Sequence, residues 1–496
     1  MYLQHKMRFL GAILCLIGPL ALPCASRADT DPAMAAYKAA DYATAIPQLE
    51  AACNRNPKDP LVHAALLSAL VYEGAVDQAF DAADAAAAAF PDSPDVLAAR
   101  GEFAFYMGDM PEAEKLFRAA GRLRDQTARA YYGLYHLYLA ASMYRTGRLF
   151  CLKAHDIDPD DALITRAWMR YLVPEKRREV LGPFVQSHPW LFENAERDRD
   201  ANLQVAQELN ARKIFEPEGE PKDVTVRLSP LLYDPSRIRG FGIEFKIEGG
   251  RPLKLLLDTG ASGILVRQGV IDKAELEHLG SGEAWGIGDA GVRKTFSAIA
   301  NSCEIGGLKY KACLIRATEG KQRVGGEEDG LIGADVFSDY LLQIDFRKRL
   351  LHLTPLPARP PNPQGYDREI GRDRAGFTPV FRDGDHLFVT TRVNDKNTGL
   401  FLIDTGASMS NIDSTFARLS TKIRGDDFMR VRGVSGQVKD VFEADKAFIQ
   451  FARFRQKNLG LTSFNLNNYT GHQDIRMSGI LGLPILAMFR LTIDYR

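Results

Sequence analysis

The chain has 496 residues, too many for one hydrophobic core, so we expect about two to four domains. Apolar residues make up 46% of the chain and charged residues 25%, which is ordinary for a globular protein. Basic and acidic residues number 63 each, so the net charge is zero. The basic surface of a nucleic-acid-binding protein is therefore not expected, and we predict no nucleic-acid partner.

Residues 1–28 have the pattern of a secretory signal peptide. Two basic residues precede a short apolar stretch at 9–22, and Ser26 and Ala28 supply small residues where a signal peptidase cleaves. The apolar stretch is too short to span a bilayer comfortably, although an uncleaved membrane anchor is the alternative. We predict an extracytoplasmic protein, periplasmic or secreted, with no stable membrane span.

Residues 29–161 carry a 34-residue repeat. Small and apolar residues recur at three positions of each unit: Ala45, Ala79, Ala113 and Gly147; Leu49, Ala83, Phe117 and Cys151; Ala52, Ala86, Ala120 and Ala154. Small residues let paired helices approach closely, and prolines 57, 91 and 159 recur where the second helix of a unit would end. The pattern resembles the tetratricopeptide repeat, although plain alanine-rich helix is the alternative. The resemblance implies a helical module that binds a peptide or protein partner.

Residues 162–223 are predicted to be a helical extension and linker. The segment 201–213 is amphipathic, but the 34-residue register is lost. The stretch EPEGEPKD at 216–223 has the composition of a linker.

From residue 224 the pattern becomes strand-like, and it occurs twice. Two halves, 224–356 and 377–496, flank a proline-rich linker at 357–376. Three landmarks recur in the same order at nearly the same offset: Asp258 and Asp404 lie 146 residues apart, Gly333 and Gly482 lie 149 apart, and Asp345 and Asp494 lie 149 apart. We interpret the halves as a tandem duplication.

Asp258 and Asp404 each open an identical Asp-Thr-Gly-Ala-Ser segment after an apolar run. For one copy, the alternative is a turn in which the aspartate caps its own backbone. Two copies favour a shared interface where two carboxyl groups hold one proton. The ionised member can then take a proton from a water molecule while the protonated member polarises a carbonyl.

Both halves resemble the retropepsin-like and pepsin-like aspartic proteases, over about residues 230–496. The resemblance rests on Asp-Thr-Gly and on two apolar residues followed by glycine at 331–333 and 480–482. It implies a multidomain chain in which an all-α helical-repeat module precedes an all-β, two-lobed acid-protease fold. A short helix is expected after each glycine, at 334–337 and 483–486.

The resemblance also assigns roles to the duplicated segment. It implies catalytic Asp258 and Asp404, with Thr259 and Thr405 hydrogen-bonding across the two-fold axis. Gly260 and Gly406 would each offer a backbone N–H to a carboxylate. Alanines 261 and 407 follow, as in retropepsins, where pepsin-like enzymes carry serine or threonine.

A glycine-rich hairpin flap that covers the substrate is expected at 284–294, with Trp285, Gly286 and Ile287 as substrate contacts. A weaker candidate in the second half is 432–440. Glycines 286, 288 and 291 also spell the G-x-G-x-x-G of dinucleotide-binding loops, but a strand-like segment follows them where that motif needs a helix.

We therefore predict an aspartic endopeptidase that hydrolyses peptide bonds with an intramolecular Asp258/Asp404 dyad and is active as a monomer. No metal and no cofactor are expected, and the helical module would recruit the substrate or a partner. One alternative is a catalytically inactive, protease-like scaffold that binds peptides. Another is that the repeats are the working part and the lobes only process the chain itself.

Four cysteines lie outside the predicted signal peptide: Cys53, Cys151, Cys303 and Cys313. There is no CxxC pair and no metal-like spacing with histidine. Buried thiols are the favoured interpretation, and a Cys303–Cys313 bridge is left open.

Overall fold

A computed structural model describes residues 31–192, 214–284, 286–320, 328–357, 365–425, 430–433, 435–469 and 475–496. The predicted signal peptide, the amphipathic segment 201–213 and Trp285 lie outside these residues. Within them, no helix combines the length and the hydropathy that crossing a membrane requires.

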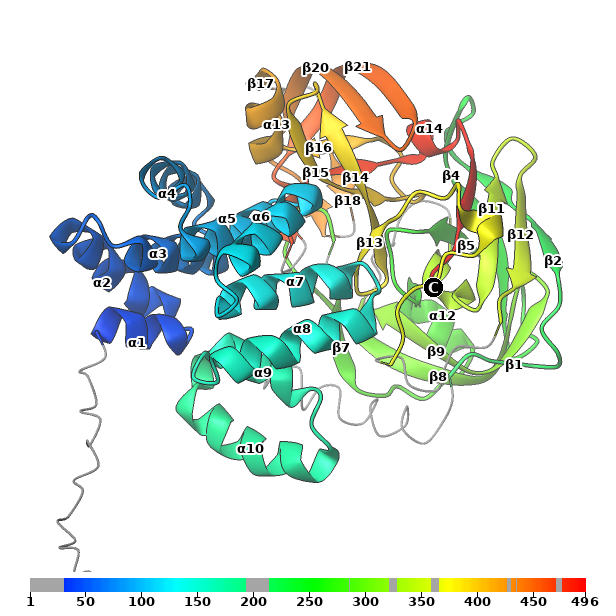
Figure 1. Cartoon of the computed structure of the whole chain (residues 1–496). Helices are drawn as coiled ribbons and strands as arrows, with labels where there is room; N and C mark the ends of the chain where they lie inside the picture. The colour runs from blue at the N-terminus through cyan, green and yellow to red at the C-terminus, as the bar shows by residue number, and fades with distance from the viewer. Residues whose placement is uncertain are drawn as a thin grey trace, which may run out of the picture.

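The N-terminal part is a series of antiparallel helices (Figure 1). They are α1 (Pro32–Lys38), α2 (Tyr42–Arg55), α3 (Pro60–Glu73), α4 (Val76–Ala89), α5 (Pro94–Tyr106), α6 (Met110–Leu123), α7 (Ala128–Ala140), α8 (Tyr144–Ile157), α9 (Ala162–Met169) and α10 (Pro174–Ser187). Helices α2, α4, α6 and α8 have 14 residues each and repeat the 34-residue spacing of the sequence. The residues at the repeated positions are buried, including the Cys151 thiol. The predicted helical repeat is confirmed.

Ion pairs and aromatic contacts inside this module hold its two ends together. The Arg129 guanidinium on α7 lies 2.6 Å from the carboxylate of Asp161 and 3.4 Å from that of Glu102. It also lies 4.7 Å from the ring centre of Tyr37 on α1. Nearby, Lys38 pairs with Asp158 at 2.9 Å, so the first helix is fastened to the end of the fourth repeat.

The C-terminal part consists of two β-rich lobes. The elements of lobe 1 are β1 (Glu216–Pro217), β2 (Val224–Arg227), β3 (Ser229–Asp234), β4 (Arg237–Ile247), β5 (Leu253–Asp258), β6 (Ile264–Arg267), α12 (Gln268–Lys273), β7 (Ser281–Ala284), β8 (Arg293–Ile305), β9 (Leu308–Thr318), β10 (Gly330–Gly333), η2 (Ala334–Phe337), β11 (Tyr340–Asp345) and β12 (Leu350–Pro355). Strand β1 pairs with β9, so the start of the predicted 216–223 linker lies along the edge of this lobe.

The elements of lobe 2 follow the same plan. They are β13 (Phe381–Asp383), β14 (His386–Val393), β15 (Asn397–Ile403), β16 (Asn411–Asp413), α13 (Ser414–Ser420), β17 (Ile423–Gly425), β18 (Arg432–Gly433), β19 (Gly436–Gln437), β20 (Phe442–Phe451), β21 (Phe454–Phe464), β22 (Gly479–Leu481), α14 (Leu483–Leu486) and β23 (Arg490–Ile493). Strand β5 runs parallel to β10 in one lobe, as β15 does to β22 in the other. Both predicted short helices, η2 and α14, follow at the expected residues. The predicted fold class is confirmed.

A four-stranded sheet joins the two lobes. Its order is β2-β12-β11-β23, so the last strand of the chain pairs with β11 of the first lobe (Figure 1). One apolar core then runs through both lobes, from Val226 to Tyr495. The lobes therefore fold as one body around their common interface.

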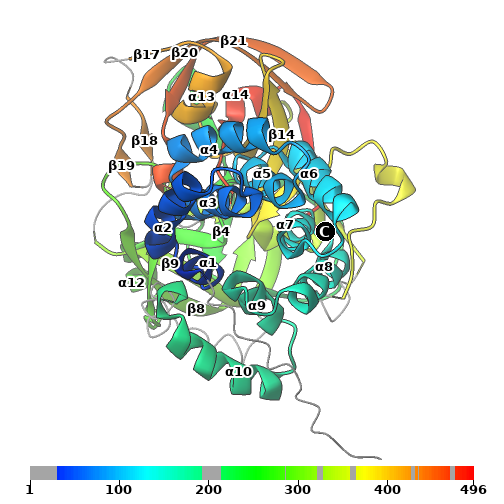
Figure 2. The ribbon, with the colours of Figure 1, turned by 60° about the vertical axis from the view of Figure 1, so that its left-hand side comes forward.

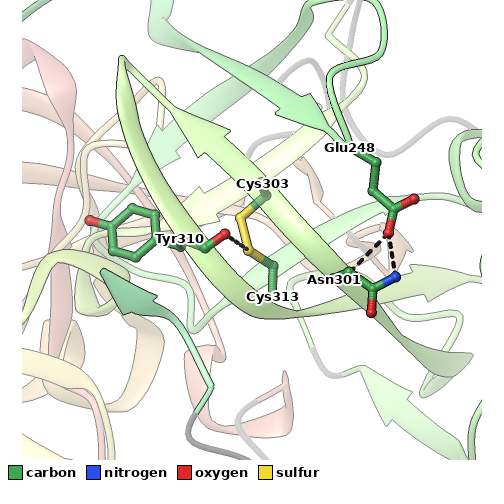
Figure 3. The surroundings of a disulfide bond; sticks show 5 residues. All are labelled: Glu248, Asn301, Cys303, Tyr310 and Cys313. Carbon is green, nitrogen blue, oxygen red and sulfur yellow. Dashed lines mark hydrogen bonds between the residues drawn. A yellow bond between two sulfur atoms is a disulfide. The ribbon is translucent and has the colours of Figure 1, made fainter. Parts of the chain in front are cut away.

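The cysteines differ in part from expectation. Cys303 on β8 and Cys313 on β9 form a disulfide across this antiparallel pair, with Cα atoms 6.2 Å apart (Figure 3). The favoured interpretation of free thiols is wrong for this pair, because the hairpin between them brings two buried strands side by side. Cys53 and Cys151 are free.

Candidate active site

The two Asp-Thr-Gly loops meet at the interface between the lobes. Asp258 ends β5 and Asp404 follows β15, and their carboxyl groups are half-buried and hydrogen-bonded to each other. A Cβ added at Gly260 would lie 2.6 Å from the Cγ of Asp404, and one at Gly406 would lie 2.3 Å from the Cγ of Asp258. Each glycine thus lets the carboxyl group of the opposite lobe approach closely.

Thr259 and Thr405 form a reciprocal set of hydrogen bonds across the lobes. The Thr259 hydroxyl donates to the carbonyl of Ile403 at 2.7 Å and accepts from the backbone N–H of Thr405 at 3.0 Å. The Thr405 hydroxyl donates to the carbonyl of Leu257 at 2.8 Å and accepts from the N–H of Thr259 at 3.1 Å. Because both threonines are buried, these four bonds fix one loop against the other.

The two carboxylates accept different numbers of hydrogen bonds from the backbone. Gly260 N–H donates to Asp258 at 2.9 Å. Asp404 accepts two such bonds on one oxygen, from Gly406 and Ala407, both at 2.8 Å. The equivalent N–H of Ala261 lies 3.4 Å from the backbone carbonyl of Asp258 instead. The second donor could not be predicted from the residue type, since alanine supplies it from its backbone.

The unequal numbers of backbone hydrogen bonds give the two carboxyl groups different affinities for the shared proton. Burial and the adjacent Asp404 carboxylate raise the pKa of Asp258 well above its ordinary value. Burial also raises the pKa of Asp404, but the N–H bonds from Ala407 and Gly406 and the hydrogen bond from Asp258 oppose that rise. The two carboxyl groups therefore share one proton, and the two backbone N–H bonds on Asp404 favour its ionised form.

Two glycine-rich loops, one from each lobe, are hydrogen-bonded to each other. The loop 286–292 between β7 and β8 contains Gly286 and Ile287, and the hairpin β18–β19 lies within 432–440. Ile287 accepts from Ser435 N–H at 3.0 Å, and Ser435 accepts from Ala290 N–H at 2.9 Å. A Cβ at Gly288 would lie 2.2 Å from the backbone of Ser435. Both segments predicted as flaps thus meet, although nothing in their residue pattern indicated this contact.

No metal-binding cluster of three or more histidine, cysteine, aspartate or glutamate side chains occurs in the described ranges. Glycines 286, 288 and 291 lie in the β7–β8 loop, not at the start of a helix. The chemistry available in the described site is that of two carboxyl groups with one proton between them.

Comparison with known proteins agrees with this geometry. A family model described as "Aspartyl protease" matches residues 243–336, which confirms the predicted resemblance over much of lobe 1. No curated protein sequence matches the chain.

Solved structures resemble each part of the chain. An aspartic proteinase from Irpex lacteus is 12% identical, with a TM-score of 0.33, over 53% of this chain and 92% of that one. A thermophilic TPR protein of Thermus thermophilus is 18% identical, with a TM-score of 0.25, over 36% of this chain and 95% of that one.

Replacing Asp258 with asparagine should change stability in a pH-dependent way. Because the pKa of Asp258 is raised in the folded state, ionising this residue lowers the free energy of unfolding. This destabilisation is absent at pH values below the unfolded-state pKa of about 3.9, and it is complete at pH values above the folded-state pKa. D258N should therefore match the wild-type melting temperature near pH 3 and exceed it at neutral pH, as measured by thermal unfolding. D84N, on the exposed face of α4, is the control for loss of one negative charge. A gain that is the same at every pH would contradict the shared-proton assignment.

Proposed function

We propose that this protein is an aspartic endopeptidase that acts through an intramolecular Asp258/Asp404 dyad. The observation that carries the proposal is the contact between two half-buried carboxyl groups from duplicated loops, locked by Thr259 and Thr405. A half-buried, hydrogen-bonded pair of this kind is poorly explained as a structural feature, because the raised pKa of Asp258 means that its ionisation costs folding free energy.

The mechanism follows from the inequality between the carboxyl groups. Asp404, the ionised member, is the general base that takes a proton from a water molecule attacking the peptide carbonyl carbon. Asp258 donates its hydrogen bond to the carbonyl oxygen as negative charge develops there. The proton gained by Asp404 then passes to the leaving amine. None of these steps requires a metal or a second chain, which supports activity as a monomer.

The joined loops are proposed to be the cover of the substrate site. Ile287 and Ala407, the residue that donates to Asp404, both border the apolar cluster that extends from the helical module into lobe 2 and contains Val438 of the segment 432–440 and the preceding Val431. A peptide would lie between these loops and the dyad, with Gly286 and Ile287 as contacts. The proposed role of Trp285 rests on the sequence alone.

Peptide cleavage tests the dyad directly. The purified chain should cleave a mixed peptide library between pH 3 and 8, with activity falling as the proton shared by the pair is lost. D258N and D404N should each cleave at least about 100-fold more slowly. D84N should cleave as the wild type does.

Each other outcome contradicts the proposal in its own way. Equal cleavage by wild type and D404N would assign the activity elsewhere. No cleavage by the wild type would favour an inactive, peptide-binding scaffold. Cleavage confined to the chain's own segments 216–223 or 357–376 would favour self-processing.

A substitution in the joined loops should impair catalysis without touching the carboxylates. The side chain of G288A would overlap the backbone of Ser435, so the two loops could not keep their hydrogen bonds. We expect kcat/KM to fall about 10-fold or more. Gly288 and Gly291 both have a positive φ, +134° and +76°, and no atom lies within 4 Å of a Cβ added at Gly291, so G291A is the control for placing alanine at a positive φ in this loop. Equal effects of G288A and G291A would rule out a role for the contact.

We also propose export and removal of residues 1–28. The apolar stretch at 9–22 supports this, as does the Cys303–Cys313 disulfide, since disulfides persist in oxidising compartments. The mature protein should be recovered from an extracytoplasmic fraction with Asp29 at its N-terminus. Recovery of the intact chain from the membrane fraction would favour the anchor alternative, and recovery from the cytoplasm would contradict export.

A further inference from the structure

The helical module has a series of turns that repeats along one edge. Ala40, Gly74, Gly108 and Ser142 all have a positive φ, at 56°, 76°, 82° and 58°, and follow one another at the 34-residue spacing. Each lies in the turn between the two helices of one repeat. The four turns are therefore alike in backbone conformation, and they differ in what they contact.

The third turn is docked on lobe 2. The carbonyl of Tyr106 accepts from the backbone N–H of Arg476 at 2.7 Å, and the carbonyl of Met107 accepts from the Ser478 hydroxyl at 3.4 Å. Gly108 is buried, and a Cβ there would lie 2.9 Å from the nitrogen of Leu400. Figures 1 and 2 both show α5 and α6 beside the sheet of this lobe.

The fourth turn holds the linker between the lobes. Ser142 accepts from Arg368 N–H at 3.0 Å, and Arg145 N–H donates to Tyr366 at 3.1 Å. The Asp367 carboxylate accepts from the backbone N–H of Thr146 at 2.9 Å, in the first turn of α8. Met143, the N-cap of α8, makes no side-chain capping bond of its own. Asp367 thus supplies the cap from a distant part of the chain.

The third turn contacts β15, the strand that leads to Asp404, and the start of its parallel neighbour β22. Leu400 lies in β15 and Ser478 immediately precedes β22, and Ser478 N–H donates to the carbonyl of Leu400 at 2.8 Å. The two strands then run parallel to Ile403 and Leu481. Asp404 N–H donates to the carbonyl of Leu481 at 3.1 Å. A hydrogen-bonded path therefore leads from the helical turn to the backbone of the catalytic loop.

The duplicated lobe shows what this position looks like without a helical partner. The landmark offsets equate Leu400 with Lys254 and Ser478 with Asp329. The Asp329 N–H donates to Lys254 at 2.9 Å, as Ser478 does to Leu400. Lys254 is exposed, and Asp329 pairs with Arg267, whereas Leu400 and Ser478 are 0% and 2% exposed. The same strand pair is polar where it faces water and buried where the module covers it.

We infer that the helical module is a positioning part of the protease, in which the turn 106–108 fixes the strand pair β15–β22 and thereby the placement of Asp404 against Asp258. Gly108 and Ser478 are the positioning residues. This inference rests on the proposed function of the dyad. It gives the module a role within its own chain that does not depend on a recruited partner.

Two matched glycine substitutions in the full chain test this role. G74A and G108A place alanine at equivalent turns with a similar positive φ. At Gly74 the nearest atom to an added Cβ is the Tyr106 hydroxyl oxygen, at 3.7 Å, so G74A measures backbone strain alone. G108A also pushes the turn away from Leu400. We expect kcat of G108A to fall about 10- to 100-fold, since small misplacements of reacting groups are costly, and G74A to keep the wild-type kcat.

The pH profile separates positioning from loss of stability. Moving Asp404 away from Asp258 weakens their proton sharing, so the two apparent pKa values of the pair approach each other and the bell-shaped kcat/KM profile of G108A narrows. Amide hydrogen exchange at Arg476 should also become faster in G108A and not in G74A. If G108A does not fold, S478A carries the test, with an expected fall in kcat of about two- to fivefold and a narrower profile.

A cleaving wild type whose kcat and pH profile are unchanged in the folded G108A variant, or in S478A where G108A does not fold, would overturn the inference. A wild type that cleaves nothing would overturn the proposed function instead. In that case the exchange measurement still shows whether the turn is docked.

Discussion

Two like carboxyl groups held in contact are the constraint on which the rest of the structure depends. Such a pair would separate if the lobes could move apart, because ionisation of both members is repulsive. The opposing glycines allow the approach, since a Cβ at Gly406 would lie 2.3 Å from the Cγ of Asp258. The buried bonds of Thr259 and Thr405 then resist separation, and the sheet β2-β12-β11-β23 ties the lobes together at a distance from the loops.

The two lobes are duplicates, yet the site they form is asymmetric. Asp404 accepts two backbone bonds where Asp258 accepts one, although both aspartates open the same Asp-Thr-Gly-Ala-Ser segment. The difference lies in small backbone shifts, which place Ala407 N–H on the carboxylate and Ala261 N–H near a carbonyl. A fused pair of lobes can keep such a difference, because the two lobes have different neighbours: the helical module packs against apolar residues of lobe 2 such as Leu400 and Ile480.

Periodicity made much of this arrangement predictable. The 34-residue spacing predicts paired helices in the observed register, and the repeated Asp-Thr-Gly predicts two loops at one interface. Contacts between particular side chains were less predictable from the sequence. Cys303 and Cys313 belong to no motif, and their bond depends on the β8–β9 hairpin. In the sequence, Asp367 is one of several charged residues in the proline-rich linker. It caps α8 only because the linker lies against the helices.

The contact surface between the helical module and lobe 2 can be located in the sequence by comparing the duplicated units with one another. Duplicated units begin with the same surface, so a position that is polar in one copy and apolar in the other records a different neighbour. Lys254 and Leu400 are such a pair, and next to them the charged Asp329 corresponds to the uncharged Ser478. In the helical module, glycine at 74 and 108 satisfies the same turn, but only at 108 does a close backbone approach also require it. A residue explained by local geometry at one copy can thus be required by tertiary packing at the next.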